Sequence, residues 1–219
     1  MEITPHLAEV TGTLIGDGCL SKFWSRYDNC FRYEVVFTGS GDELPYYETF
    51  VQPVIYKAFG SSSKPFLRPD DGSSRFHIRK RNVFDFFCWL KIPVGKKSRT
   101  AQIPKVIFNN GLFLKACLRG LWDTDGSIYR VYSKQYKNHS RCYDKQLAMQ
   151  YKTSSERLAK QVKEALELFS IQTNKIGRSG DCFVIRITSQ SEIQKFLDAI
   201  GFRNLHHLRQ LERFRSQSI

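Results

Sequence analysis

The chain has 219 residues, of which 41% are apolar, so it is long enough to bury a substantial core and is not a disordered polymer. Its 34 Lys and Arg outnumber 21 Asp and Glu, and the net charge of +13 indicates a polyanionic partner, with nucleic acid favoured over an anionic membrane. No apolar run reaches the length of a membrane span, and residues 1–20 lack the pattern of a signal peptide. The six cysteines form no Cys-x-x-Cys pair, which argues against a zinc site and suits reduced thiols inside a cell.

The first half is predicted to begin with a helix that ends at Asp17-Gly18 and to finish with a helix at residues 82–92. The elements expected between them are strands at 19–27 and 31–39, an amphipathic helix at 42–59, and short strands at 64–68 and 74–80.

The second half repeats this order. After a second Asp-Gly-terminated helix come strands at 126–134 and 143–152, a helix at 153–169, a hairpin at 171–178 and 182–188, and helices at 189–200 and 205–215. Each half therefore reads αββαββα. We expect an α+β protein of two pseudosymmetric repeats, at residues 1–92 and 111–219, joined by a linker at 93–110.

One motif is duplicated. VTGTLIGDGCL at residues 10–20 recurs as LRGLWDTDGSI at residues 118–128, an offset of 108 residues. Gly12 and Gly16 lie four residues apart on one face of the predicted helix, and Gly120 matches Gly12 in the second copy. Small residues let another helix approach closely, so we expect the two helices to pack against each other.

Each copy ends in an aspartate, Asp17 or Asp125. A helix C-terminus is partially negative and repels a carboxylate, and two neighbouring carboxylates repel each other as well. A hard divalent cation such as Mg²⁺ relieves both effects, because it prefers oxygen ligands. A single Asp-Gly pair would indicate only a turn, but two of them in so basic a chain predict a metal centre acting on the phosphodiester bonds of a duplex.

At these residues the chain resembles the LAGLIDADG homing endonucleases. VTGTLIGDG is a degenerate copy of the family's name motif, and LRGLWDTDG is a closer one. The resemblance implies a monomer with two saddle-shaped antiparallel sheets along the major groove of double-stranded DNA, and no membrane partner. It also implies Mg²⁺-dependent cleavage of both strands at a long asymmetric target, with Ca²⁺ or Mn²⁺ able to replace Mg²⁺ in crystals.

The resemblance also assigns roles to residues. The last acidic residue of each motif binds metal in the family, which makes Asp17 and Asp125 the implied catalytic and metal-binding residues. Gly16 and Thr124, which precede them, are implied as further metal contacts. A basic residue often lies near each scissile phosphate, and Lys97 is the implied catalytic lysine of the first half, ahead of Lys96.

The sequence departs from the family pattern in three places. Asp123 matches an acidic position of the motif, but the first copy has Ile15 there, so we expect Asp123 to have a structural role at best. The water-positioning Gln or Lys after the second strand is replaced by small residues, which are Gly39 and Ser40 in the first half and Ser154 and Ser155 in the second. The second half has no lysine equivalent to Lys97, and His207 or Arg209 is expected in its place.

Alternation along the predicted strands suggests which residues read DNA, because residues two apart face the same way. Arg can bind guanine with two hydrogen bonds, and Glu can accept one from cytosine. The expected DNA-binding residues are Lys22, Arg26, Arg32, Glu34, Arg75, His77, Arg79, Tyr129, Arg130, Lys152, Arg186 and Thr188. A solvent-facing sheet would show the same alternation.

Three alternatives compete with a free-standing, intron-encoded homing endonuclease. A maturase on the same scaffold would bind intron RNA, which is therefore a second potential partner. The endonuclease module of an intein is disfavoured here, because no splice-junction residues stand at the ends of the sequence. A transcription regulator on this scaffold would be expected to lose the aspartates, yet both are present.

Overall fold

A computed structural model describes residues 2–131, 134–135, 140–141 and 146–216. The first repeat comprises α1 (Pro5–Asp17), β1 (Gly18–Ser25), β2 (Cys30–Gly39), η1 (Gly41–Glu43), α2 (Leu44–Tyr46), η2 (Tyr47–Val51), α3 (Gln52–Phe59), β3 (Phe66–Leu67), β4 (Ser74–Ile78) and α4 (Arg81–Trp89). The helix expected at 42–59 is thus built from consecutive pieces, with a π-helical turn at η2. Pro53 lacks the N–H that would continue the α-helical ladder there, which accounts for the irregularity.

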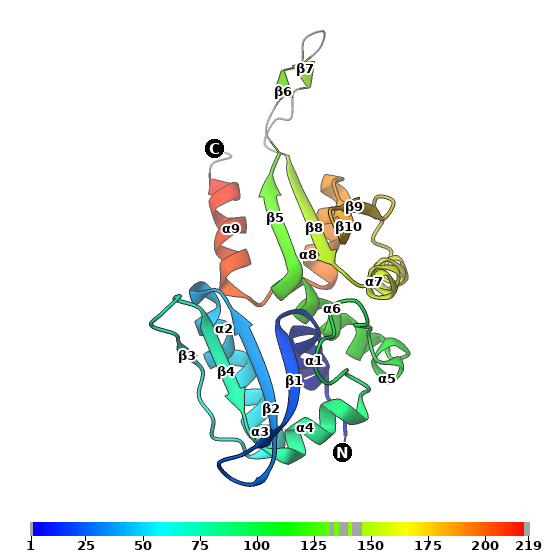
Figure 1. Ribbon diagram of the computed structural model, residues 1–219. Coiled ribbons are helices and arrows are strands. Elements are labelled where there is room, and N and C mark those ends of the chain that lie inside the picture. Colours follow the sequence, from blue (N-terminus) through cyan, green and yellow to red (C-terminus); the bar gives the residue numbers. More distant parts are fainter. Residues whose placement is uncertain (1, 132–133, 136–139, 142–145, 217–219) are drawn as a thin grey trace.

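The second repeat follows a short helix, α5 (Lys105–Phe108). Its elements are α6 (Gly111–Asp125), β5 (Gly126–Arg130), β6 (Lys134–Gln135), β7 (Ser140–Arg141), β8 (Leu147–Thr153), α7 (Glu156–Leu168), β9 (Gly177–Ser179), β10 (Cys182–Ile187), α8 (Gln190–Ala199) and α9 (Leu205–Ser216). The small β6–β7 hairpin extends away from the rest of the molecule (Figure 1). Part of the polar loop at 135–143 lies outside the described residues.

Two antiparallel four-stranded sheets have matching strand orders, β1-β2-β4-β3 and β5-β8-β10-β9. Gly18 pairs with Phe37 in the first sheet, and Gly126 pairs with Tyr151 in the second, so the strands leave the two motif helices in the same register. This arrangement confirms the predicted pair of αββαββα repeats.

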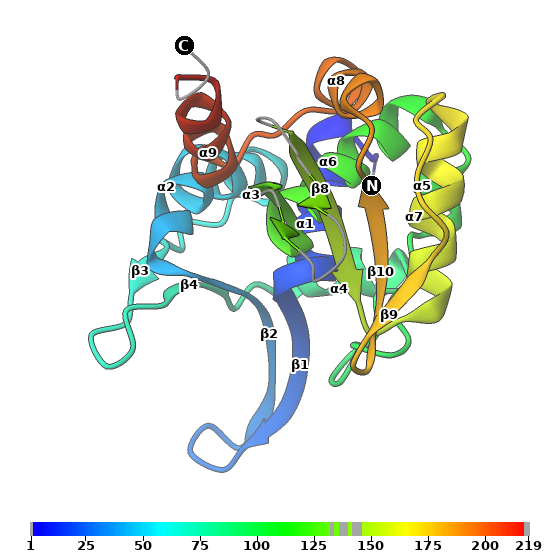
Figure 2. The same cartoon turned by 90° about the horizontal axis from the view of Figure 1, so that it is seen from above.

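Helices cover one side of both sheets. Helices α1 and α4 pack against β2, while α7 and α8 pack against β8. The helices gather on one side of the molecule, and the β1–β2 and β9–β10 hairpins extend toward the other (Figure 2). Strand residues on the helix side, such as Val35 and Ile185, are fully buried. The opposite faces of the sheets are left open for a partner.

A buried ion cluster ties the repeats together. The Glu9 carboxylate of α1, which is 1% exposed, accepts hydrogen bonds from Arg203 Nε at 2.5 Å and from Arg119 Nη1 at 3.3 Å. Arg119 belongs to α6, and Arg203 follows α8. A buried carboxylate that lost these partners would be strongly unfavourable, so the cluster fixes α1 against both segments.

In the described part of the chain, no helix has the length and apolarity needed to cross a bilayer.

Candidate active site

Helices α1 and α6 pack backbone to backbone at the centre of the molecule (Figure 1). A Cβ atom on Gly12 would lie 2.1 Å from the Cys117 carbonyl oxygen, and one on Gly120 would lie 2.1 Å from the Glu9 carbonyl oxygen. Real Cβ atoms do not approach so closely, so glycine is required at both positions. The expected helix contact is therefore present, and it is symmetric between the two motifs.

This contact brings the C-terminal ends of α1 and α6 side by side. A Cβ atom on Gly16 would lie 3.4 Å from Asp125 Oδ2, so the Asp125 carboxylate reaches the end of α1. Burial raises the pKa of Asp17 to about 8, with the charges of Glu43 and Asp125 adding to the rise. Burial also raises the pKa of Asp125 to about 6, although Lys97 opposes that rise. The two carboxylates thus lie in each other's field, largely removed from water.

Lys97 lies against the end of α1. Its Nζ atom donates hydrogen bonds to the carbonyl oxygens of Ile15, at 2.5 Å, and Gly16, at 3.0 Å. These are terminal carbonyls without helical N–H partners, and a positive charge is favourable at this end of a helix. Burial lowers the pKa of Lys97, while Asp125 and Asp17 favour its charged form. Lys97 is therefore positioned among the carboxylates, whereas Lys96 is exposed.

Asn204 occupies the corresponding place in the second repeat. Ile15 and Asp123 are equivalent in the duplicated motif, and Asn204 Nδ2 donates to the Asp123 carbonyl oxygen at 3.0 Å. The same amide group also donates to Glu43 Oε1 at 3.1 Å. Of the two residues expected here, Arg209 is exposed, and His207 is buried against Phe202, with ring centroids 4.6 Å apart. A hydrogen bond to the Asp123 backbone partly counteracts the lowering of the His207 pKa, so His207 also lies at this helix end. The role of either residue beside a phosphate stays a prediction. The equivalence of Asn204 to Lys97 depends on the conformation of the loop between α8 and α9, which residue spacing does not predict.

Glu43 is a site residue that the sequence reasoning missed. Its charge raises the pKa of both Asp17 and Asp125. Its Oε2 atom accepts a hydrogen bond of 2.7 Å from the Ser40 backbone N–H. A signal was present in the sequence, since Ser40 and Glu43 have capping-box spacing just beyond the second strand.

Asp123 stays outside the site. It is fully buried, and its carboxylate accepts hydrogen bonds from the backbone N–H groups of Arg203 and Asn204 at 3.0 to 3.1 Å. Burial raises its pKa to about 7. These contacts attach the segment after α8 to α6, which is a structural role.

The donor set fits a hydrated divalent cation. Asp17 and Asp125 supply hard carboxylate oxygens, which suit Mg²⁺. The hydroxyls of Tyr47 and Tyr151 are fully buried without any hydrogen-bond partner, and the charge of Asp17 contributes to a raised pKa at both. Such groups normally bond to water or an ion. Among the described residues, no three Asp, Glu, His or Cys side chains converge on one point, so most ligands of such a cation would be water, DNA or main-chain oxygen.

The two residues implied as further metal contacts are already engaged within the protein. The Gly16 carbonyl oxygen accepts a hydrogen bond from Lys97, and Thr124 Oγ1 donates to the carbonyl oxygens of Gly120 and Leu121 at 3.0 and 3.1 Å. These bonds leave lone pairs free on both oxygens, so they do not by themselves exclude a metal role for Gly16 or Thr124.

The open face of the first sheet displays a polar row. The expected DNA-binding residues on it are Arg32, Glu34, Arg75, His77 and Arg79. The Glu34 carboxylate accepts from Arg79 Nε at 2.6 Å, and Arg75 Nη1 donates to Thr38 Oγ1 at 2.6 Å. These bonds restrict the arginine side chains and so organise the surface that would meet a base edge.

Lys22 and Arg26 lie apart from this row. Lys22 pairs with Tyr33 on the helix side of the sheet, and its Nζ lies 4.7 Å from the centroid of the Phe31 ring. Arg26 lies in the exposed turn between β1 and β2. The structure thus places Lys22 away from the open face, as strand alternation requires of a residue two positions from buried Leu20.

The open face of the second sheet carries a similar row. Gln150 pairs with Ser127 on β5 and with Arg186 on β10, so these three share one face. Tyr129 and Lys152 lie two residues further along their strands on that face, and Thr188 follows Arg186. Arg130 points to the other side, together with buried Ile128.

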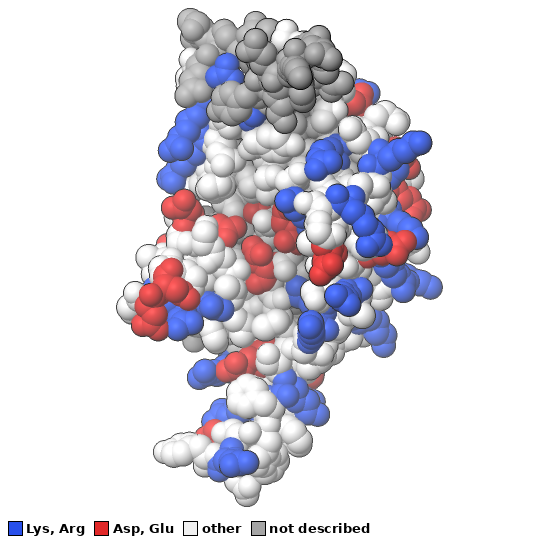
Figure 3. Space-filling model, turned by 45° about the horizontal axis from the view of Figure 1, so that its top comes forward, with Lys and Arg blue, Asp and Glu red and all other residues white. Residues whose placement is uncertain are grey.

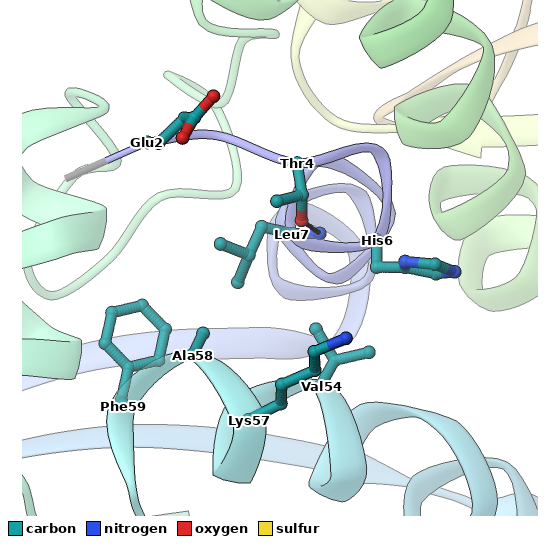
Figure 4. Close-up of a pocket in the computed structure, with 8 residues that line it drawn as sticks. All are labelled: Glu2, Thr4, His6, Leu7, Val54, Lys57, Ala58 and Phe59. Atoms are coloured by element: carbon teal, nitrogen blue, oxygen red, sulfur yellow. Dashed lines mark hydrogen bonds between the residues drawn. The ribbon is translucent and has the colours of Figure 1, made fainter.

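The surface has one hollow beside the paired aspartates and another far from them. One of about 430 Å³ opens beside Asp125 and is lined by Lys97, Lys152, Ser154 and Cys182, among others. The other, between α3 and the N-terminal end of α1, lies at the opposite end of α1 from Asp17 (Figure 4).

Asp and Glu side chains gather near the middle of one face of the molecule, with Lys and Arg around them (Figure 3). That charge pattern suits a cation held against a polyanion.

Comparison with known proteins identifies related sequences. Residues 113–201 match the LAGLIDADG-like domain family. The chain is 28% identical over 204 residues to the replicative DNA helicase DnaB of Synechocystis sp., covering 87% of this chain and 21% of the helicase. It is 26% identical over 225 residues to DnaB of Nostoc sp., covering 95% and 23%. The chain therefore spans about a fifth of the length of these curated relatives.

Solved structures share the fold of the whole chain. The crystal structure of I-DmoI in complex with DNA and Ca has a TM-score of 0.67 at 17% identity, covering 95% of this chain and 97% of that one. The LAGLIDADG meganuclease I-AabMI bound to uncleaved DNA has a TM-score of 0.62 at 13% identity, covering 99% and 90%. Full-length WhiA from Thermatoga maritima has a TM-score of 0.55 at 14% identity, covering 98% and 61%.

Proposed function

We propose that the chain is a site-specific DNA endonuclease acting inside the cell as a monomer. The proposal starts from the match of residues 113–201 to the LAGLIDADG-like domain family and from the two-repeat fold shared with I-DmoI and I-AabMI. The enzyme would cut both strands of a long asymmetric duplex target in a reaction that depends on a divalent cation, Mg²⁺ being the expected physiological one. The homing role, with the gene located in an intron, is part of this proposal.

The carboxylate pair supports this proposal most directly. WhiA has the same fold, so the fold alone does not make the chain a nuclease. Asp17 and Asp125 lie at two touching helix ends, largely buried and with raised pKa values, an arrangement that is unfavourable without a cation. Proteins retain such costly arrangements mostly at functional sites.

The division of roles follows from the residues around this pair. Asp17 and Asp125 would hold the cation, which when bound polarises the scissile phosphate and lowers the pKa of water. Lys97, held between the two helix ends, would place a positive charge beside the phosphate. The open faces of the sheets would fix the register through the polar rows described above, including Arg79, Glu34, Lys152 and Arg186.

A second candidate function is the endonuclease module of an intein. The curated relatives favour it, because the match covers most of this chain but only about a fifth of each helicase chain. A nuclease inserted in a longer host protein would produce such a match. The DNA-cleavage chemistry would be the same, and only the genetic element would differ.

Selection from a randomised duplex library tests the proposal. We expect incubation with Mg²⁺ to release cleaved molecules that share one long, asymmetric sequence, with a break in each strand. A chain that cuts no DNA with Mg²⁺ or Mn²⁺, but binds structured intron RNA tightly, would instead be a maturase.

A further inference from the structure

Glu43 takes the place of a side chain that β2 lacks. A Cβ atom on Gly39, the last residue of β2, would lie 2.2 Å from Glu43 Oε2 and 2.8 Å from the Tyr47 hydroxyl. The Glu43 carboxylate and the Tyr47 hydroxyl therefore fill the space that a larger residue at position 39 would use, next to the end of β2.

The carboxylate of Glu43 is fixed from two directions. The Ser40 backbone N–H binds Oε2, and the Asn204 side chain binds Oε1. Asn204 is itself 1% exposed and belongs to the second repeat, so it supports Glu43 from across the molecule. A carboxylate has about four acceptor sites on its two oxygens, so Glu43 can still accept a hydrogen bond from water.

The Tyr47 hydroxyl provides independent evidence of a missing ligand. It is fully buried and has no hydrogen-bond partner. Burial raises its pKa, and the charges of Asp17 and Glu43 contribute to the rise, so the hydroxyl lies near both carboxylates. An unpaired hydroxyl in this position calls for an ordered water or an ion-bound water.

Glu43 does not converge with Asp17 and Asp125 on one point, given that no three-residue metal cluster occurs among the described residues. Mg²⁺ typically keeps several of its waters in proteins, and outer carboxylates that bind such waters tune the affinity of the site. We propose that Glu43, together with the Tyr47 hydroxyl, is a positioning residue that holds water bound to a divalent cation on the Asp17 side of the centre, and so serves cleavage of one DNA strand only.

The restriction to one strand follows from the second repeat. Phe37 pairs with Gly18 in the first repeat, and Tyr151 pairs with the equivalent Gly126 in the second. Phe37 and Tyr151 are therefore equivalent, and the residue six positions further along is Glu43 in the first repeat and residue 157 in the second. That residue is Arg157, which is exposed on α7 and has the opposite charge. Lys97 and Lys152 instead line the hollow beside Asp125. This inference rests on the proposed nuclease function.

Two measurements test it with the whole chain. In the first, Mn²⁺ binding to the free protein is followed by electron paramagnetic resonance. Glu43→Gln should weaken Mn²⁺ binding about 10-fold, the lower end of the effect of outer-shell groups. Glu156→Gln is the matched control, since Glu156 is exposed on α7 and pairs with Lys160, and it should bind Mn²⁺ like the wild type.

In the second measurement, the selected target carries a different label on each strand. Glu43→Gln should cut one strand about 10-fold more slowly while the other strand keeps its rate, so nicked DNA accumulates. Tyr47→Phe, which conserves side-chain volume, should slow the same strand. Unchanged Mn²⁺ affinity in Glu43→Gln, or equal slowing of both strands, overturns the inference. If the wild type cuts neither strand, the proposed function fails, and the Mn²⁺ comparison still decides whether Glu43 serves a cation.

Discussion

The C-terminal ends of α1 and α6 are alike in their backbones and different in their surroundings. Gly12 and Gly120 make equivalent close contacts, and each helix ends in an aspartate. At both ends the charge of Glu43 raises the aspartate pKa and that of Lys97 lowers it, but at Asp17 Glu43 has the larger effect of the two, and the pKa is raised to about 8. At Asp125 the ammonium of Lys97 has the larger effect and partly offsets burial, so the pKa is raised only to about 6.

This difference shows which parts of the duplication tolerated change. The helix contact needs glycine on both sides, so it stayed symmetric. The side chains that bind the carbonyl oxygens at the helix ends differ in charge between the two halves. Lys97 binds the carbonyl oxygens of Ile15 and Gly16, whereas neutral Asn204 binds that of Asp123. Under the proposed function, one scissile phosphodiester would meet the ammonium of Lys97 and the other would lie nearer the hydrogen-bonded carboxylate of Glu43.

The largest expected effect comes from the feature that both ends share. Asp17→Asn or Asp125→Asn should each reduce double-strand cleavage by about 1,000-fold, because each removes an anionic metal ligand whose cation stabilises the transition state by several kcal/mol. Affinity for target DNA, measured by gel shift in Ca²⁺, should remain within a few-fold of wild type. Either variant cutting both strands at the normal rate would disprove the assignment.

The symmetric helix contact can be broken on either side. Gly12→Ala and Gly120→Ala should each lower the free energy of unfolding by about 3 kcal/mol, since the new methyl group meets a backbone carbonyl that cannot move aside. Urea denaturation measures this change. Gly111→Ala at the start of α6 is the control, because a Cβ atom there meets nothing within 4 Å. Equal stability of Gly12→Ala and Gly111→Ala would show that the helices are less closely packed than described.

The asymmetric lysine gives a smaller and one-sided effect. Lys97→Met should slow cleavage of one strand by about 100-fold, as expected for loss of a charged group beside the reacting phosphate. The affected strand should be the one that Glu43→Gln leaves at its normal rate. Lys96→Met, which changes an exposed lysine next in sequence, should cut both strands normally. If both lysine variants behave alike, Lys97 acts only as part of the basic surface.

The smallest effect concerns stability at acid pH. Burial lowers the pKa of His207 from 6.5 to about 4, so the unfolded chain takes up this proton first as the pH falls. The contribution of neutral His207 to the free energy of unfolding is fully present above pH 6.5 and is lost as the pH falls toward 4. The loss amounts to about 2 kcal/mol between pH 7.5 and 5.

His207→Phe should therefore flatten the pH dependence of the melting temperature over this range. His6→Phe, at an exposed position, is the control and should leave the acid sensitivity unchanged. Equal acid sensitivity of His207→Phe and the wild type would mean that His207 does not titrate between these states.

The features that could be predicted from the sequence are local patterns that occur in both repeats. The duplicated motif, the order of strands and helices, and the pair of carboxylates could all be read from spacing, because helix and strand periodicity are local properties of the chain. The π-helical turn at η2 could not be predicted from periodicity, since Pro53 perturbs the hydrogen bonds of the preceding turn without ending the helix.

The sequence by itself determined the two-repeat architecture, the contact between glycine-bearing helices, and the meeting of Asp17 with Asp125. Only the tertiary structure decided what surrounds them. Glu43 and Asn204 are 161 residues apart, yet they share a hydrogen bond. Asn204 also binds the Asp123 carbonyl oxygen, at the position equivalent to the Ile15 carbonyl oxygen that Lys97 binds. Such contacts depend on how loops from different repeats fold over the helix ends, and no local periodicity encodes that geometry.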